Sequence, residues 1–295
     1  MKRWVQALAI IMTLLAMPSS FAQQSGETSE AKLLHKWTLK GFDRPESLIL
    51  SADGSEIYVS NVNGDSNAID GNGYISRVSR NSGKIIEKKW ITGLNGPKGF
   101  ALDDGKIYIA DIKDLVVVDI SEKKITNRVP IPDAVFLNDV AVIKGRVFIS
   151  DTGGDKLYSY TDEKGITIFK SGEQVNAING LVSKDDKLLL TLMETGELVS
   201  LNPDDGKMNS LAKGLANGDG IGVLPDGGYL ITSYSGEIYH ISFNWGWRLI
   251  LDSKPDNISQ NDSFYYNNVL YVANMNSGSI TAWHVTVKLI PSTDF

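Results

Sequence analysis

A short pattern, a polar or charged residue followed by an apolar run of strand-forming residues, returns six times in this sequence. The residues that open the six copies are Glu46, Lys98, Asn138, Asn179, Asp219 and Asp262. Successive copies lie 52, 40, 41, 40 and 43 residues apart. A period near 40 residues is typical of propeller blades or solenoid units. The repeat therefore restricts the possible folds more strongly than any single motif.

The rest of each copy indicates a stack of short strands. A turn pair such as Asp53-Gly54 follows the apolar run, and a second run, such as residues 57–60, comes directly after the turn. Residues 74–78 and 85–90 supply a third and a fourth run in the first copy. Since no stretch has the pattern of a long amphipathic helix, the sequence predicts an all-β, six-bladed β-propeller with four-stranded antiparallel blades.

The sixth copy contains only three predicted strands, which end near residue 287. Residues 35–41 (His-Lys-Trp-Thr-Leu-Lys-Gly) resemble residues 88–93 (Lys-Lys-Trp-Ile-Thr-Gly), which form the fourth predicted strand of the first copy. We therefore expect the N-terminal strand to complete the last blade and to remove an exposed sheet edge. Residues 33–295 are then one domain.

The N-terminus has the pattern of a secretory signal peptide. Lys2 and Arg3 precede an apolar run over residues 5–17, and Ser20-Phe21-Ala22 matches a cleavage site after Ala22. Residues 23–32 are polar and are expected to be a disordered lead-in. The sequence contains no cysteine, so neither a lipid anchor on cysteine nor a disulfide is expected. We predict a periplasmic protein with no membrane anchor.

The charge balance restricts the partners. The formal net charge is −6 for the whole chain and about −8 without residues 1–22, which carry two basic and no acidic residues. An acidic chain without a basic stripe argues against nucleic acid and anionic lipid. We expect a small-molecule substrate or cations as partners, and the sequence leaves a protein partner open.

The six opening residues are expected to meet at the propeller axis, because the first strand of each blade lies along the central channel. Three carboxylates and one ammonium give this ring a charge of −2. Carboxylate and amide oxygens without sulfur or histidine favour a hard divalent cation, calcium before magnesium. The expected ligands are Glu46, Asn138, Asn179 and Asp219.

Two other interpretations of the ring remain open at this point. Its members are also common turn residues, and each could simply introduce a strand. Lys98 could also pair with Glu46 and Asp262 and fill the channel as a cluster of ion pairs without metal.

The ring also resembles that of a known family. Glu46, Asn138-Asp139, Asn179-Gly180 and Asp219-Gly220 are similar to the series in SMP-30/gluconolactonase/LRE-like propellers, and more distantly to paraoxonase and strictosidine-synthase-like propellers. The resemblance implies a calcium-dependent lactonase in which the metal polarises a lactone carbonyl and activates water. It assigns the four ligands named above and makes Asp219 the general base.

The sequence departs from this family in its substrate contacts. Asn138-Asp139 is followed by Val140 instead of the usual glycine, and no arginine closely precedes it to bind a sugar acid. These differences argue against gluconolactone as the substrate. The histidines His35, His240 and His284 fall in outer strands and are expected to be structural.

Lys98 and the segment 61–73 complete the candidate site. Lys98 is a candidate catalytic residue that stabilises an oxyanion or binds a substrate carboxylate, and charge balance alone is the other interpretation. Segment 61–73, which lengthens the first repeat, is predicted to be a flexible loop; a lid or a second cation site through Asp65 and Asp70 is the alternative. The leading function is a metal-dependent lactone or ester hydrolase, and the alternative is a non-catalytic propeller that binds a small ligand or a protein.

Overall fold

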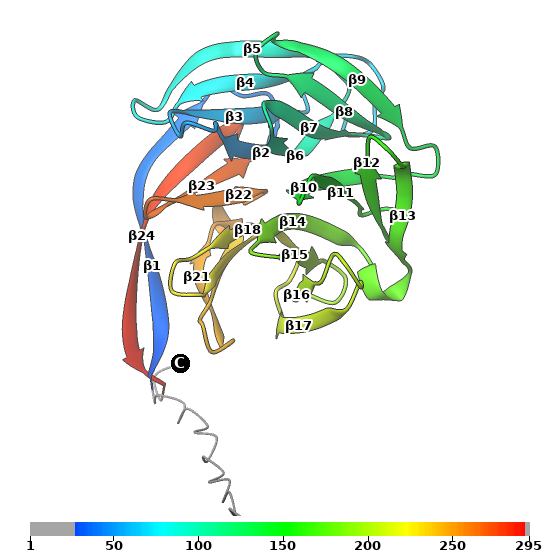
Figure 1. Cartoon of the computed structure of the whole chain (residues 1–295). Coiled ribbons are helices and arrows are strands. Elements are labelled where there is room, and N and C mark those ends of the chain that lie inside the picture. Colours follow the sequence, from blue (N-terminus) through cyan, green and yellow to red (C-terminus); the bar gives the residue numbers. More distant parts are fainter. Residues whose placement is uncertain (1–26, 293–295) are drawn as a thin grey trace, which may run out of the picture.

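The computed structural model describes residues 27–292. Its strands form six four-stranded antiparallel sheets arranged in a ring (Figure 1). The prediction of a six-bladed β-propeller is confirmed. The predicted signal peptide, residues 1–22, lies outside the described residues.

The first five blades are each formed by four consecutive strands. The first contains β2 (Pro45–Leu50), β3 (Glu56–Asn61), β4 (Gly73–Ser79) and β5 (Lys84–Leu94). The second contains β6 (Pro97–Asp103), β7 (Lys106–Asp111), β8 (Asp114–Asp119) and β9 (Lys124–Pro130). The third contains β10 (Leu137–Ile143), β11 (Arg146–Asp151), β12 (Lys156–Thr161) and β13 (Gly165–Ser171). The fourth contains β14 (Ile178–Lys184), β15 (Lys187–Leu192), β16 (Glu197–Leu201) and β17 (Met208–Lys213). The fifth contains β18 (Gly218–Val223), β19 (Tyr229–Ser233), β20 (Glu237–Ile241) and β21 (Trp247–Asp252).

The sixth blade closes the ring with strands from both parts of the chain. Its order is β22 (Ser263–Tyr266), β23 (Val269–Asn274), β24 (Ser279–Pro291) and β1 (Glu27–Lys40). The long β1–β24 ribbon lies at the left of Figure 1. The pairing confirms closure by the N-terminal strand.

Part of the predicted lead-in is ordered, which corrects the expected boundary. Residues 27–32 belong to β1, and Ala31 is only 1% exposed because it packs against Leu224 and Leu230 next to the fifth blade. Glu30 also pairs with Arg248 of β21. A polar sequence can therefore form a strand here, because small side chains face the neighbouring blade and charged ones face solvent.

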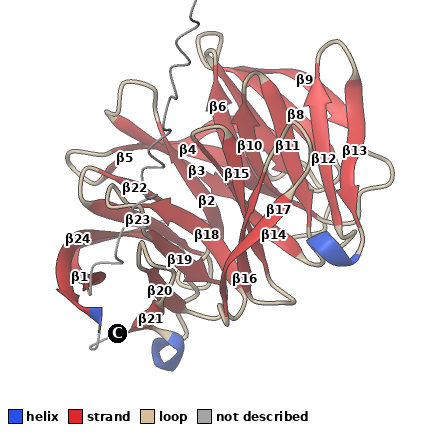
Figure 2. Cartoon of the chain, turned by 60° about the horizontal axis from the view of Figure 1, so that its bottom comes forward, coloured by secondary structure: helices blue, strands red, loops and turns tan. Residues whose placement is uncertain are grey.

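The core consists of apolar layers between adjacent blades. Alternate residues of each strand point to opposite faces of the sheet, so a strand such as β15 buries leucines against both neighbours. Tyr58 and Trp90 stack at 4.8 Å between ring centroids within such a layer. Two short 3₁₀ helices, η1 (Glu173–Val175) and η2 (Lys254–Asp256), lie in connections between blades (Figure 2). Within residues 27–292, no helix has the length and apolar character needed to cross a membrane.

Candidate functional site

A β-bulge turns the ring residue of each of the first five blades toward the axis. In the first blade, Pro45 pairs with Asn61 and Leu48 pairs with Val59, so the inner strand contains one extra residue. The same shift occurs at the start of β6, β10, β14 and β18. Such bulges redirect side chains at sheet ends. The sequence pattern of a polar residue before an apolar run is therefore the signature of this bulge.

Hydroxyl side chains of the second strand stabilise four of these bulges. Each accepts a hydrogen bond from the backbone N–H that follows the ring residue, over 2.8 to 3.0 Å. The donor and acceptor pairs are Ser47 and Ser60, Asp139 and Ser150, Gly180 and Thr191, and Gly220 and Thr232. Sequence reasoning missed these hydroxyls, although Ser or Thr ends the second apolar run of the four blades concerned.

The strand register corrects the sixth member of the ring. Ser263 pairs with Val272 in the sixth blade as Leu48 pairs with Val59 in the first, so Asn261 takes the position of Glu46. The prediction of Asp262 at this position is wrong by one residue. The axial ring is therefore Glu46, Lys98, Asn138, Asn179, Asp219 and Asn261.

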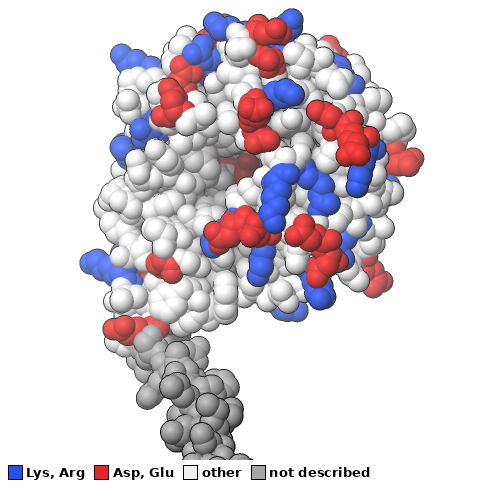
Figure 3. Space-filling model, in the orientation of Figure 1, with Lys and Arg blue, Asp and Glu red and all other residues white. Residues whose placement is uncertain are grey.

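A cavity of about 230 Å³ lies over the axial ring and is lined by all six of its members. Phe136, Met193 and Met275 supply apolar walls, and Arg44 and Tyr234 also line the cavity. Figure 3 shows a hollow near the axis on one face, with acidic side chains inside it. The predicted site residues Glu46, Lys98, Asn138, Asn179 and Asp219 thus meet in one cavity, as the repeat predicted.

Two carboxylates of the axial ring, Glu46 and Asp219, are buried and form no ion pair within 4 Å among residues 27–292. Burial, together with the charge of Asp262, raises the pKa of Glu46 to about 8. Burial and the neighbouring charges of Glu46 and Asp262 also raise the pKa of Asp219 well above its usual value. The charge of Lys98 opposes the shift of Glu46 but does not outweigh burial.

A second acidic layer lies one residue further along the inner strands. Asp139 and Asp262 come from blades on opposite sides of the ring and border a cavity of about 220 Å³. Asp139 accepts backbone hydrogen bonds from Leu181 at 2.6 Å and Val140 at 2.7 Å. Burial nevertheless raises the pKa of Asp139, and it raises that of Asp262 to about 6. The axis therefore carries four carboxylates.

Glycines allow the inner strands to approach this closely. A Cβ atom at Gly180 would lie 2.0 Å from the carbonyl oxygen of Asp219, and one at Gly220 would lie 2.2 Å from the backbone nitrogen of Ser263. The glycine after Asn179 and after Asp219 is therefore required by the packing of adjacent blades.

Lys98 does not neutralise the carboxylates by direct contact. Its Nζ donates to the carbonyl oxygens of Gly96 at 3.2 Å and Ser66 at 3.3 Å, and it lies 4.1 Å from the centre of the Phe136 ring. No described carboxylate lies within 4 Å of it. In this structure Lys98 therefore forms no direct ion pair with Glu46 or Asp262. Burial lowers the pKa of Lys98, and the charges of Glu46 and Asp111 oppose this shift.

Polar residues at the end of the second strand of a blade form hydrogen bonds to the turn that precedes its ring residue. Asp111 accepts backbone hydrogen bonds from Asn95 at 2.9 Å and Gly96 at 2.8 Å, just before Lys98. In the same way, Asp151 accepts a hydrogen bond from the backbone N–H of Phe136, and Asn61 accepts one from the backbone N–H of Asp43.

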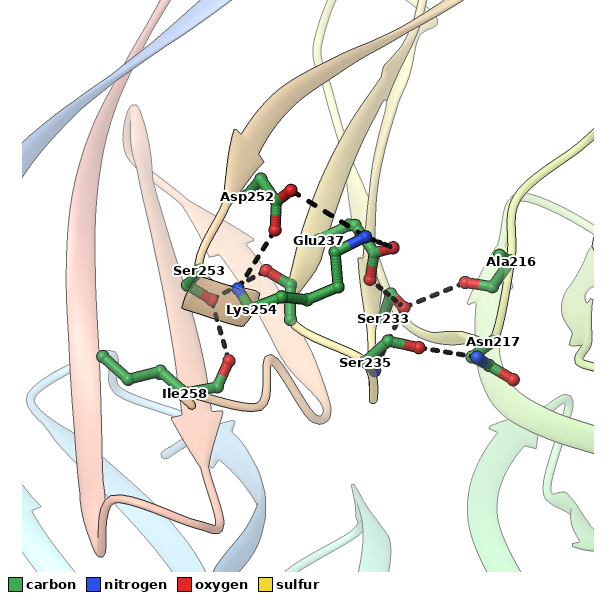
Figure 4. A network of polar contacts seen from close by, with 10 residues as sticks. Ala216, Asn217, Ser233, Ser235, Glu237, Asp252, Ser253, Lys254 and Ile258 are labelled. Carbon is green, nitrogen blue, oxygen red and sulfur yellow. Dashed lines mark hydrogen bonds and ion pairs between the residues drawn. The ribbon is translucent and has the colours of Figure 1, made fainter. Parts of the chain in front are cut away.

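The fifth blade uses a larger polar network for the same purpose (Figure 4). The one O–H of Ser233 is shared between the carbonyl oxygen of Ala216 at 2.9 Å and Glu237 at 3.0 Å. Lys254 pairs with Glu237 at 2.7 Å. Because Ala216 lies three residues before Asp219, the network fixes the turn that delivers this carboxylate.

The loop of residues 62–72, which we call the mouth loop, borders the cavity through Ser66. Asp65 and Asp70 accept hydrogen bonds from Asn67 and Asn72 within the loop. Both carboxylates therefore have hydrogen-bond partners within the loop. No group of three or more His, Cys, Asp or Glu side chains that could hold a metal ion occurs in the described part of the chain.

The three histidines, and also the exposed tryptophan Trp245, lie away from the cavity. His240 is buried in the fifth blade, and His35 and His284 lie on β1 and β24. Trp245 stacks on Tyr229 at 6.1 Å in a hairpin of the fifth blade. None of these residues borders the cavity over the axial ring.

The axial ring fits a hard cation. The Oε2 atom of Glu46 and the Oδ1 atom of Asn179 are buried and have no hydrogen-bond partner among the described residues. Buried oxygens of this kind are rare unless water or an ion satisfies them. Oxygen donors from Glu46, Asn138, Asn179 and Asp219 are the ligand type that calcium prefers.

Comparisons with known proteins support the fold. No protein-family model matches the sequence, and no curated protein matches it significantly. Similar solved structures include a catalytically inactive virginiamycin B lyase from Staphylococcus aureus with quinupristin, which is 13% identical. That alignment covers 87% of this chain and 99% of the other, with a TM-score of 0.61. A streptogramin B lyase is 12% identical over 88% of this chain and 98% of its own, with a TM-score of 0.60.

A chain of the nidogen–laminin complex is 14% identical over 75% of this chain and 97% of its own, with a TM-score of 0.61. At these identities the similarity establishes the propeller fold alone. The propellers named here include enzymes and a member of a protein complex, so function has to be argued from the site.

Proposed function

We propose that this protein is a metal-dependent hydrolase of a lactone or related ester, with calcium as the expected ion. The observation that carries the proposal is the pair of unsatisfied buried oxygens, on Glu46 and Asn179, in a ring of oxygen donors that borders a cavity. Glu46, Asn138, Asn179 and Asp219 would hold the ion. Such an ion supplies Lewis-acid polarisation of a carbonyl oxygen when it is bound.

The chain's own groups suit the remaining tasks of a hydrolysis. The carboxylate of Asp219 borders the cavity, so it can accept a proton from a water molecule that attacks a bound ester there. Lys98 places a positive charge at the same cavity. The walls formed by Phe136, Met193 and Met275 limit the water that reaches a bound ester.

On the basis of the predicted signal peptide, we expect this activity in the periplasm, so the substrate would be a small molecule that reaches that compartment. The alternative is a propeller that binds a ligand without turning it over and that uses the ion for stability. The two proposals differ in whether Asp219 is needed for chemistry or only for the ion.

The test is pH-stat hydrolysis of a panel of lactones by the mature protein, with calcium and then with a chelator. Asp219→Asn is the active-site variant. Asp186→Asn, which changes a carboxylate on the hairpin after β14 that is 81% exposed, is the matched control. Turnover lost with the chelator and in Asp219→Asn, but kept in Asp186→Asn, supports the hydrolase. Absence of turnover across the panel, with calcium still raising the melting temperature, supports the binding propeller.

A further inference from the structure

Two cations from different blades converge on Ser66 of the mouth loop. Arg44, just before β2, donates through Nη2 to Ser66 Oγ at 3.2 Å, and Lys98 of β6 donates to the carbonyl oxygen of Ser66 at 3.3 Å. Arg44, Lys98 and Ser66 all border the cavity over the axial ring. One residue of the loop therefore occupies the acceptor position between both cations.

Neither cation forms an ion pair within 4 Å among residues 27–292, although the charge of Glu46 acts on Lys98 from a greater distance. The other side-chain hydrogen bond of Arg44 among these residues is to Met275 Sδ at 3.2 Å, a weak acceptor. Lys98 is only 1% exposed, yet its two acceptors are backbone carbonyls at 3.2 and 3.3 Å. Of the three N–H donors of this ammonium, the two that form hydrogen bonds both bond to uncharged carbonyls. A buried ammonium without a directly bonded anion is costly, so a ligand anion placed against Lys98 would gain favourable electrostatic energy.

We propose that Arg44 and Lys98 form a carboxylate-binding subsite at the cavity, in which Ser66 occupies the place of the ligand's carboxylate. The subsite defines the ligand as a small molecule with a carboxylate apart from its reacting carbonyl. The claim that this ligand is a hydrolysed lactone or ester rests on the proposed function. The claim that the cavity prefers an anion does not.

A carboxylate fits this subsite better than a more highly charged anion. The planar guanidinium of Arg44 can bind both oxygens of a carboxylate, and Lys98 adds a point charge beside it. Glu46 and Asp219 border the same cavity, and in its ionised form each of them penalises a further negative charge on the ligand. A ligand with a single negative charge next to the two cations therefore has the best balance between attraction to Arg44 and Lys98 and repulsion by the carboxylates.

Binding is coupled to the mouth loop. A ligand carboxylate takes the donors of Arg44 and Lys98 away from Ser66, so these two hydrogen bonds no longer hold the loop. Ser66→Ala removes the hydroxyl acceptor and leaves both cations in place, so it retains or raises the affinity for a carboxylate.

The test uses a ligand pair that cannot be hydrolysed as a lactone. Tetrahydrofuran-2-carboxylate and its carboxamide are titrated by NMR into the full mature protein, with calcium and again with a chelator. We expect the carboxylate to bind about tenfold or more tightly than the carboxamide, and Arg44→Gln and Lys98→Met each to remove about tenfold of that affinity. Arg44→Lys retains more affinity than Arg44→Gln. Lys187→Met, which removes a charge at the start of β15, changes nothing.

Equal binding of the two probes, or unchanged affinity in Arg44→Gln, would overturn the subsite. A carboxylate affinity that depends on calcium but not on Arg44 or Lys98 would also overturn the subsite, because the probe would then bind the ion of the axial ring. Arg44 is exposed, so its variant keeps the test valid even where Lys98→Met does not fold. Turnover of neutral lactones without anion preference contradicts the subsite alone, whereas anion binding without any turnover contradicts the hydrolase alone.

Discussion

The carboxylate of Asp151, at the end of β11, accepts a 2.7 Å hydrogen bond from the backbone N–H of Phe136. Val135 and Gly154 also donate backbone hydrogen bonds to this carboxylate. Phe136 borders the cavity, and Asn138 follows it by two residues. A wholly buried carboxylate thus fixes the turn that introduces a ring residue.

Asp151→Ala should destabilise the protein by roughly 3 kcal/mol, because it leaves several buried N–H groups without an acceptor. Asp151→Asn keeps one oxygen acceptor and should cost less. Urea denaturation followed by tryptophan fluorescence measures both free energies of unfolding. Equal stability of wild type and Asp151→Ala would show that the turn does not depend on this carboxylate.

The sequence predicted the fold and most of the ring because both depend on a local pattern that repeats. The bulge at Glu46 and at its counterparts needs a polar residue before an apolar run, and this pattern is visible in single repeats. The sixth position was misassigned because the Asn261-Asp262 pair offers two polar residues, and only the pairing of Ser263 with Val272 decides between them. Arg44 was missed because the approach of the mouth loop to two blades leaves no local signal.

Calcium should raise the melting temperature of the mature protein, because an ion that binds only the folded state stabilises it. The gain is about 2.7 kcal/mol at a hundredfold excess over the dissociation constant. Glu46→Gln and Asp219→Asn should reduce this gain, and Asp186→Asn should keep it. Differential scanning fluorimetry with calcium and with a chelator gives the comparison. A wild-type melting temperature that neither addition changes would argue against an ion in the axial ring.

His240 should make stability fall as the solution becomes acidic. It is wholly buried in β20, where Nδ1 accepts a hydrogen bond from the backbone N–H of Ala31 at 3.3 Å. Burial lowers the pKa of His240 to about 4. The charges of Asp226 and Glu30 oppose this shift, and the charge of Arg248 adds to it.

The direction follows from the two pKa values. The unfolded chain protonates His240 near pH 6.5 and the folded chain only near pH 4, so its stabilising contribution is complete above pH 6.5 and is lost between these values. The total loss is about 3 kcal/mol. The buried ring carboxylates act in the opposite direction, so the informative quantity is the difference between wild type and His240→Gln. Chemical denaturation from pH 4 to 8 should show a flatter profile for the variant, and His35→Gln, on exposed β1, is the control. Parallel profiles for wild type and His240→Gln would contradict the assignment.

The N-terminal part of β1 should be essential to the stability of the closed ring, although the sequence there is polar. Ala31 is 1% exposed against the fifth blade, whereas Leu34 on the same strand is 60% exposed. Ala31→Glu forces a charge into an apolar contact with Leu224 and Leu230 and should cost roughly 3 kcal/mol. Leu34→Glu adds the same charge in solvent and should change stability by about 0.5 kcal/mol or less. Urea denaturation of the two variants compares them directly. Equal effects would mean that β1 does not pack against the fifth blade in solution, and the ring would then be closed by residues 35–40 alone.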